Sequence, residues 1–246
     1  MPMIKSRLLS LPIQGSTFGF SATRLEDLGA SEYTLVVLSA DDSGSVSGFV
    51  RDIERCIKDV VKACHQSPRA DNLMVRFTRF ASDFTEVHGF KPLATCQAAH
   101  YDKALQGDGM TRLYDATFNA VESVVRYAED LHQGGFAANG IVFVLTDGMD
   151  NMSKATAKQV AASLTAARKA ETLESLISIL VGVNVKDAQV SRYLQTFADE
   201  GGFTQYVELE GADAGTLARL AAFVQKSILQ QSMLLGTGQQ GATLRF

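Results

Sequence analysis

The chain has 246 residues, of which 46% are apolar and 20% charged, and its net charge is -4. This length fits one large domain with an extensive core. A slightly acidic chain offers no broad basic surface to phosphates, so nucleic acid and anionic membranes are disfavoured as partners. The apolar runs are far shorter than the roughly 20 residues of a membrane span, and the first residues lack the apolar core of a signal peptide.

Cysteine usage indicates a reducing compartment. Cys56, Cys64 and Cys96 form no C-x-x-C pair. Cys56 and Cys64 fall on one expected helix, about 12 Å apart along its axis, which is too far for a disulfide. Free thiols are typical of a reducing environment. The sequence therefore predicts a cytoplasmic protein whose cysteines are structural.

Short apolar runs alternate with helical periodicity from residue 33 onward. This alternation predicts an α/β fold with a doubly wound, mostly parallel central sheet of about six strands and helices on both faces. A short antiparallel edge strand near 85–90 completes the six. The other strands are expected at 33–40, 73–80, 140–147, 175–183 and 203–209.

Apolar residues at three- and four-residue spacing predict the helices between these strands. One such pattern runs from Val46 to Cys64, and another from Leu113 to Leu131. Further helices are expected at 154–171 with Ser153 as its cap, at 188–200 ended by Gly201 and Gly202, and at 214–229 with Asp213 as its cap.

Two terminal segments lie outside this pattern. Residues 31–229 form the expected domain, preceded by an N-terminal extension (1–30) and followed by a polar, glycine-rich tail (230–246). Such segments are often frayed. The alternatives are that the tail docks on a partner, or that the extension packs on the domain through its apolar residues Phe18, Phe20, Leu25 and Leu28. The sequence leaves these alternatives open.

Acidic and hydroxyl side chains gather where two of the expected strands end. Asp41 ends one strand and is followed by Ser43 and Ser45 in the stretch DDSGS, and Asp147 ends another. Thr111 comes just before a helix in the stretch GDGMTRLYDA. In open parallel sheets, sites form in the crevice outside the carboxyl ends of the strands. Both carboxylates are expected to face that crevice if their strands are neighbours.

These five side chains have the chemistry of a metal site. Two carboxylates within a few ångströms of each other repel unless a proton or a cation lies between them. Hydroxyls add neutral oxygen ligands, and an oxygen shell with few carboxylates suits a hard divalent cation, Mg²⁺ in particular. The competing interpretation is that each residue serves only as a turn or cap residue.

Several polar neighbours are given no direct role. Asp42 is expected to be a spare acid that faces outward, because side chains alternate at a strand end. Asp150 and Asn151 are expected to shape the turn after Asp147, with support of the site as the alternative. The four histidines are scattered and form no zinc motif with the cysteines.

The stretches DDSGS, GMTRLYDA and LTDGMDN resemble, in this order, the metal-ion-dependent adhesion site (MIDAS) of von Willebrand factor type A (vWA) domains. The element order across residues 33–229 agrees with that family. The resemblance is to stand-alone intracellular, bacterial-type members with a complete motif. It implies that Mg²⁺ or Mn²⁺ is held by Asp41, Ser43, Ser45, Thr111 and Asp147. In the family, the hydroxyls coordinate the cation and the aspartates act directly or through water.

The resemblance implies a non-catalytic module that binds a partner protein's Asp or Glu carboxylate through the cation. Intracellular members occur beside ATPases and stress-response systems, which are candidate partners. One alternative is a Mg²⁺-dependent hydrolase or phosphoryl-transfer enzyme, which is disfavoured because the sequence has neither a G-x-x-x-x-G-K-[ST] nor a G-x-G-x-x-G loop. Another is a structural subunit whose metal only holds its loops.

Overall fold

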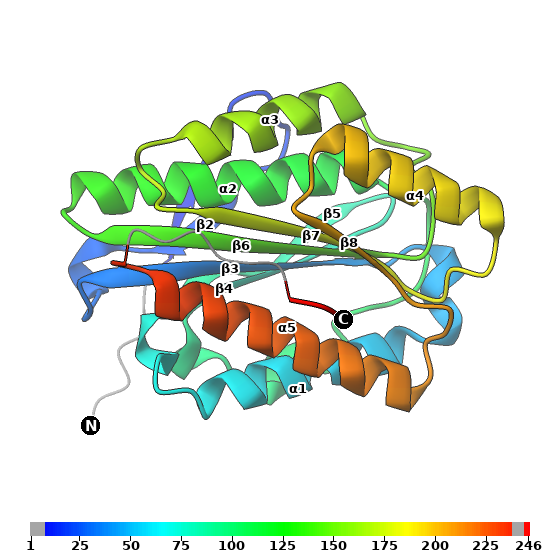
Figure 1. Ribbon diagram of the computed structural model, residues 1–246, viewed down its shortest axis with the longest axis horizontal. Coiled ribbons are helices and arrows are strands. Elements are labelled where there is room, and N and C mark those ends of the chain that lie inside the picture. Colours follow the sequence, from blue (N-terminus) through cyan, green and yellow to red (C-terminus); the bar gives the residue numbers. More distant parts are fainter. Residues whose placement is uncertain (1–7, 238–243) are drawn as a thin grey trace.

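A computed structural model describes residues 8–237 and 244–246 of the chain. Its strands form one mixed, mostly parallel eight-stranded sheet in the order β1-β2-β5-β4-β3-β6-β7-β8, with helices above and below it (Figure 1). The strands are β1 (Leu8–Leu11), β2 (Phe20–Thr23), β3 (Glu32–Asp41), β4 (Leu73–Phe80), β5 (Phe84–Pro92), β6 (Ala137–Thr146), β7 (Leu176–Gly182) and β8 (Gln205–Glu208).

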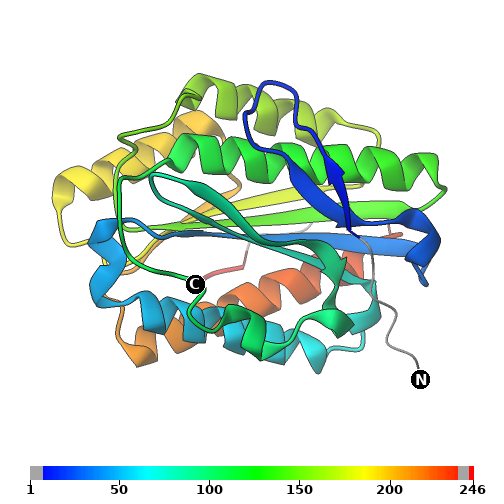
Figure 2. The same ribbon diagram turned by 180° about the vertical axis from the view of Figure 1, so that it is seen from behind.

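The central strands are apolar on both faces because helices cover both sides of the sheet. In β3, Val36 and Leu38 belong to one core cluster, whereas Leu35 and Val37 belong to the other, as the alternation of side chains in a strand requires. The first cluster lies under α1 (Val50–His65) and α5 (Ala214–Leu234). The second lies under α2 (Leu113–Gln133), α3 (Ala157–Lys169) and α4 (Ala188–Gly201), on the opposite face (Figures 1 and 2).

The parallel pairing of the central strands determines where the candidate site lies. β3 pairs in parallel with β4 and with β6, and β6 pairs in parallel with β7. Neighbouring parallel strands end at the same edge of a sheet, so Asp41 at the end of β3 lies next to the residues that end β6. The strands that precede Asp41 and Asp147 are therefore neighbours, which is the condition set for the two carboxylates to face the same crevice.

The sheet has eight strands rather than the expected six because β1 and β2 extend it. The expected antiparallel strand near 85–90 is β5, which pairs with β4 in that orientation. It is not an edge strand, since β2 pairs with it on its other side. β1 then pairs antiparallel with β2 and forms the edge.

Several helix ends differ from the sequence-based expectation. α1 begins at Val50, after a short 3-10 turn at Gly44–Gly48. α3 begins at Ala157, and its cap is Thr156, which forms a capping box with Gln159, rather than Ser153. α5 continues to Leu234. The caps at Asp213 and at Gly202, whose φ is +71°, are confirmed.

Residues 18–28 pack onto the rest of the sheet, as one of the two alternatives predicted, whereas residues 1–7 of the expected extension lie outside the described part of the chain. Phe20 is buried against Phe90, with ring centroids 6.1 Å apart, and the rings of Phe18 and Phe84 are 5.0 Å apart. At the other terminus, the ring centroids of Phe246 and of Phe223 in α5 lie 5.6 Å apart. Residues 238–243 of the expected tail lie outside the described part of the chain.

A fully buried arginine ties this N-terminal segment to the sheet. Arg76 in β4 donates to Glu86 (2.6 Å), to Ser123 (3.1 Å) and to Asn119 (2.9 Å). Glu86 also accepts from the backbone and hydroxyl of Ser21, at 2.9 and 2.5 Å. The charge is therefore paired and hydrogen-bonded, which is the condition for burying a guanidinium. One buried ion links β4, β5, α2 and β2.

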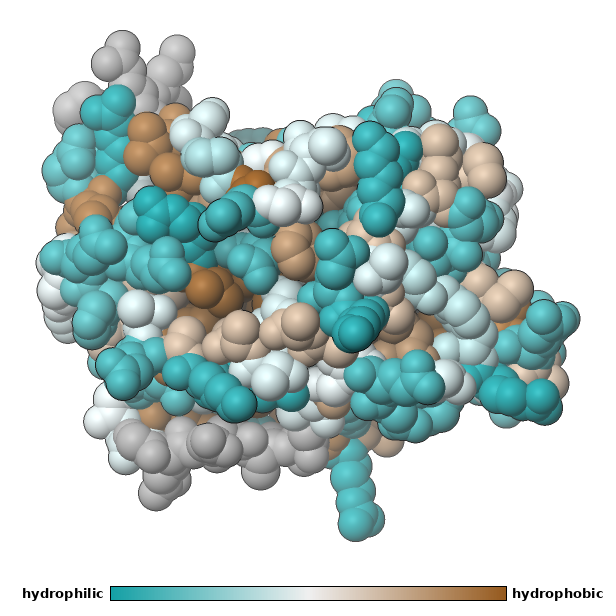
Figure 3. All heavy atoms as spheres, turned by 90° about the horizontal axis from the view of Figure 1, so that it is seen from above, coloured by the Kyte–Doolittle hydropathy of each residue, from teal (hydrophilic) through white to brown (hydrophobic). Residues whose placement is uncertain are grey.

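No helix within residues 8–237 has both the length and the apolar composition needed to cross a membrane. Seen from the side of α2, α3 and α4, the surface is mostly hydrophilic, and apolar residues form only small scattered groups (Figure 3).

Replacing Arg76 by methionine should lower the free energy of unfolding by about 3 kcal/mol, because Glu86 loses the charge that compensates its burial. Urea unfolding of the wild type and the variant measures this difference. Arg126→Met is the matched control: the side chain of Arg126 is 41% exposed, whereas that of Arg76 is fully buried, so its loss should cost less than about 1 kcal/mol. Equal effects of the two substitutions would contradict the assigned role of the buried pair.

Candidate metal centre

The candidate site begins at the buried carboxylate of Asp41, at the carboxyl end of β3. Its Oδ1 accepts from the backbone N–H of Ser43 at 2.8 Å, and its Oδ2 accepts from the hydroxyl of Thr146 at 2.6 Å. Thr146 is the last residue of β6. Asp41 is only 1% exposed. Its hydrogen bonds with Ser43 and Thr146 fix the orientation of its carboxylate where β3 and β6 end.

Two serine hydroxyls connect this end of β3 with Asp147. The Oγ atoms of Ser43 and Ser45 lie 3.1 Å apart, and the hydroxyl of Ser45 donates to Oδ1 of Asp147 at 2.7 Å. Ser43 is buried, and Ser45 stands in the 3-10 turn that precedes α1. Hydrogen bonds therefore connect four of the five predicted residues, with the backbone N–H of Ser43 as the link to Asp41.

Thr111, the fifth residue, is buried, and its backbone connects its loop to the loop that follows Asp147. Its N–H donates to Oδ1 of Asn151 at 2.8 Å, and its carbonyl accepts from the N–H groups of Asn151 and Met152 at 3.1 and 3.2 Å. The N–H of Gly44 donates to the carbonyl of Gly109 at 3.0 Å. The loop that carries Thr111 thus contacts the two loops that carry the other site residues.

Asp42 does not face outward, contrary to the expectation from strand alternation. Its carboxylate is 1% exposed, pairs with Arg79, and accepts from the N–H groups of Gln106 and Gly107 at 2.5 and 2.7 Å. The physical reason is that the loop before α2 folds over this face of the strand end. A signal was present in the sequence, since two consecutive acids follow a buried strand and an arginine lies near the end of the next one.

The loop after Asp147 is organised by two acids. Asp115, in the first turn of α2, accepts from the N–H groups of Lys154 and Ala155 at 3.1 and 2.8 Å. Asp150 accepts from the hydroxyl of Ser153 at 2.5 Å. The turn-shaping role expected for Asp150 is confirmed, and Asn151 also supports the Thr111 backbone. The role of Asp115 was not predicted, although this residue lies in the stretch GMTRLYDA.

Electrostatics at the site favour a bound proton or cation. Burial raises the pKa of Asp41 to about 6, against the opposing effect of hydrogen bonds from Ser43 and Thr146, and the neighbouring Asp147 raises it slightly further. Burial also raises the pKa of Asp147. Across the described residues, no lysine, arginine or histidine is paired with either carboxylate. No cationic side chain within residues 8–237 and 244–246 therefore balances this negative charge.

The residues present fit a hard cation. Two carboxylates and three hydroxyl-bearing side chains provide oxygen donors with little charge, as such ions prefer. In the described ranges no three His, Cys, Asp or Glu side chains are grouped to hold a metal, and the cysteines are buried free thiols. A soft-metal site of the zinc type has no ligands here, so any metal would depend on the serine and threonine oxygens.

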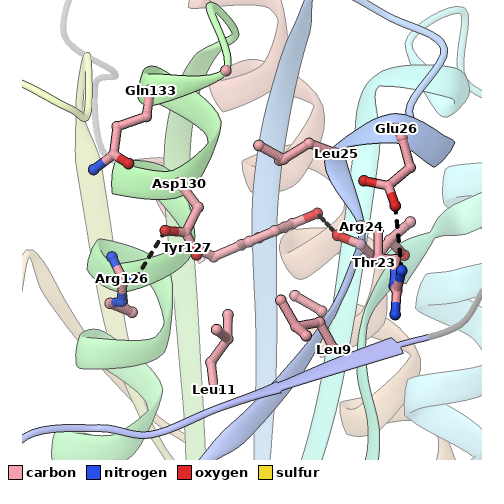
Figure 4. Close-up of a pocket in the computed structure, with 12 residues that line it drawn as sticks. Leu9, Leu11, Thr23, Arg24, Leu25, Glu26, Arg126, Tyr127, Asp130 and Gln133 are labelled. Atoms are coloured by element: carbon pink, nitrogen blue, oxygen red, sulfur yellow. Dashed lines mark hydrogen bonds and ion pairs between the residues drawn. The ribbon is translucent and has the colours of Figure 1, made fainter.

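A cavity of about 590 Å³ lies elsewhere in the molecule, between the β1–β2 hairpin and the C-terminal half of α2. Leu9, Leu11, Leu25 and Tyr127 point toward it, and the Tyr127 hydroxyl donates to the carbonyl of Thr23 (Figure 4). None of its lining residues belongs to the acidic site. The two features are at opposite ends of α2, because the site lies near its first residue.

No protein-family model matches the sequence, and no curated protein is similar to it in sequence. Solved structures do share its fold. The open conformation of the pilus adhesin SpaC from Lactobacillus rhamnosus GG has a TM-score of 0.61 at 11% identity, covering 82% of this chain and 30% of the adhesin. A mutant of the PilB minor pilin from Streptococcus sanguinis has a TM-score of 0.60 at 15% identity, covering 86% of this chain and 64% of the pilin.

Proximal thread matrix protein 1 from the mussel byssus is a third such structure, with a TM-score of 0.57 at 18% identity, covering 82% of this chain and 47% of the mussel protein. Another structure of that protein has a zinc-occupied MIDAS motif. The present chain spans less than two thirds of the length of each of the three proteins. At these identities the likeness shows a shared fold, in proteins that are adhesins, pilins and matrix proteins.

The stability of the metal-free protein should fall as the pH rises from about 4 to about 7. Native Asp41 keeps a proton up to a pKa of about 6, whereas the unfolded chain releases it near 3.8, so the native state binds more protons in this window. The difference of about 2 units corresponds to roughly 3 kcal/mol. Urea unfolding at several pH values in EDTA measures this loss.

Asp41→Asn is the control for this pH dependence, because the amide does not titrate and its unfolding free energy should lack this component. Mg²⁺ should raise the melting temperature of the wild type more at pH 7 than at pH 5, since protons compete for the same oxygens. A wild type and an Asp41→Asn variant with parallel pH profiles would refute the assignment of the shift to this carboxyl.

Proposed function

We propose that this chain is a vWA-type module that binds a carboxylate of a partner protein through a divalent cation. Asp41, Ser43, Ser45, Thr111 and Asp147 would hold the cation, which would be Mg²⁺ or Mn²⁺. The observation that carries the proposal is the set of hydrogen bonds that links Asp41 to the backbone N–H of Ser43, the hydroxyl of Ser43 to that of Ser45, and the hydroxyl of Ser45 to Asp147. The strand order and the helices on both faces of the sheet are compatible with a Rossmann-like vWA fold.

The hydroxyl-bearing residues and the aspartates have different tasks in this proposal. Ser43, Ser45 and Thr111 would supply neutral oxygens to the cation. Asp41 and Asp147 would balance its charge directly or through water, and Thr146 keeps Asp41 oriented by its 2.6 Å hydrogen bond. A bound divalent cation supplies positive charge and a coordination position that an external carboxylate can occupy.

The comparisons support a binding role by analogy of fold. The similar structures are named as adhesins, pilins and a matrix protein, and the mussel protein's MIDAS motif holds zinc in one structure. For this chain the partner is proposed to be a protein that presents an Asp or Glu side chain. An ATPase or a stress-response protein in the cytoplasm is the partner and setting that the sequence resemblance favours.

Two other functions compete with this proposal. In a Mg²⁺-dependent hydrolase or phosphoryl-transfer enzyme, turnover of a generic phosphoester would be measurable and would disappear in Asp41→Ala. In a structural subunit, partner binding would survive Asp147→Ala, because the cation would only hold the loops. Binding and turnover assays on the same variants separate the three functions.

Calorimetric titration should show one Mg²⁺ or Mn²⁺ site in the wild type, and Ser45→Ala should weaken it at least tenfold because the variant lacks the hydroxyl that joins Ser43 to Asp147. Selection of displayed random peptides in Mg²⁺, with elution by EDTA, should enrich Asp or Glu. Thr196→Ala is a matched control that removes an exposed hydroxyl in α4, bonded only within its own helix, and should bind metal as the wild type does.

A wild type without measurable Mg²⁺ or Mn²⁺ affinity would refute the metal site. Peptides that remain bound in EDTA, or that are enriched without an acidic residue, would refute the carboxylate mechanism. A pull-down from the host lysate with and without EDTA, using wild type and Asp41→Ala, then identifies the partner.

A further inference from the structure

The structure points to separate tasks for the two consecutive acids at the end of β3: we propose that Asp41 serves the cation, whereas Asp42 positions the loop that carries Thr111. Asp42 would not bind the metal. It would set the affinity of the site by anchoring residues 106–109 and thus the position of Thr111. The metal-binding part of this inference rests on the proposed function, and the loop-anchoring part does not.

The contacts of Asp42 all go to one loop and to one neighbouring strand. Oδ1 accepts from the N–H groups of Gln106 and Gly107 at 2.5 and 2.7 Å, and Oδ2 pairs with the guanidinium of Arg79. The backbone carbonyl of Asp42 accepts from the N–H of Asp108 at 2.9 Å. Three consecutive N–H groups of the loop are therefore satisfied by a single residue.

This loop needs such an anchor because its own structure supplies little. Between Tyr101 and Leu113 the chain forms no helix or strand, and Gln106, Asp108, Gly109 and Met110 are exposed. Ordering a residue of irregular backbone costs conformational entropy. Charge-assisted hydrogen bonds to a buried carboxylate are stronger than neutral ones and offset part of that cost.

The backbone of the loop is also shaped for close approach. Gly107 has φ +72°, and a Cβ there would come within 2.6 Å of the Cα of Ser47. Gly109 has φ +91°, and a Cβ there would come within 2.6 Å of the Ser82 hydroxyl. Both glycines occupy the left-handed region that other residues disfavour. Gly107 therefore lies directly on the 3-10 turn Gly44–Gly48, and Gly109 lies on Ser82. Asp42 lies beneath the loop.

Arg79 makes this arrangement compatible with the metal site. Without it, Asp42 would add an unpaired negative charge next to Asp41 in the chain, and like charges repel each other. The guanidinium balances Asp42 and leaves the charge of the other two carboxylates available to a cation. The side chain of Arg79 is 23% exposed, whereas that of Asp42 is 1% exposed.

The test compares Asp42→Asn and Asp42→Ala with the wild type in two measurements. Amide hydrogen exchange in EDTA reports the loop without any metal, and protection of the N–H groups of Gln106, Gly107 and Asp108 should fall at least tenfold. Calorimetric titration with Mg²⁺ should show affinity reduced by roughly 10- to 100-fold, the usual effect of losing a residue that supports metal ligands. Arg79→Met should change both in the same direction.

Glu86→Gln is the matched control, since it also neutralises a carboxylate paired with an arginine but lies in β5, outside the loop. It should lower the melting temperature while leaving loop exchange and Mg²⁺ affinity at wild-type values. Wild-type exchange and affinity in both Asp42 variants would overturn the proposal, as would an equal loss of Mg²⁺ affinity in Glu86→Gln. If the wild type binds no Mg²⁺, the proposed metal site fails, and loop exchange alone then decides whether Asp42 is the anchor.

Discussion

The parallel pairing of β3 with β6 is the constraint on which the candidate site depends. It brings the ends of two strands that are about a hundred residues apart in sequence to the same edge of the sheet, where Thr146 donates to Asp41 at 2.6 Å. The pairing is maintained by the two apolar clusters on either face of the sheet. Burial of these apolar strands stabilises the sheet, and the sheet in turn keeps the polar side chains at its end close together.

Buried charge is the second organising feature, and it is handled in two ways. Arg76 and Asp42 are each paired and hydrogen-bonded, and each holds a segment in place. Arg76 holds β2 through Glu86, and Asp42 holds the loop before α2. Asp41 and Asp147 instead accept hydrogen bonds from hydroxyls or N–H groups and have no cationic partner among the residues that the structure describes. This difference separates groups that support the fold from groups whose charge is available to a ligand.

Loops and turns carry four of the five candidate residues, whereas Asp41 is the last residue of β3. The strands bring the starting points of these loops together. The loops after β3 and after β6 each form backbone hydrogen bonds with the loop before α2. Loops positioned by a rigid scaffold are where binding residues commonly lie.

Strands β3 to β8, the helix caps at Asp213 and Gly202, and the five candidate ligands could be predicted from the sequence, because periodicity, turn chemistry and oxygen-rich motifs are local properties. The cap of α3 could also have been found there, since Thr156 and Gln159 have the local spacing of a capping box. Two features emerged only from the folded chain: residues 8–23 add two strands, and Asp42 is buried. Both depend on which distant segment covers a given residue. For Asp42 the alternation of side chains was right locally, but the loop from residues 106–109 covers that face, and no local pattern records that contact.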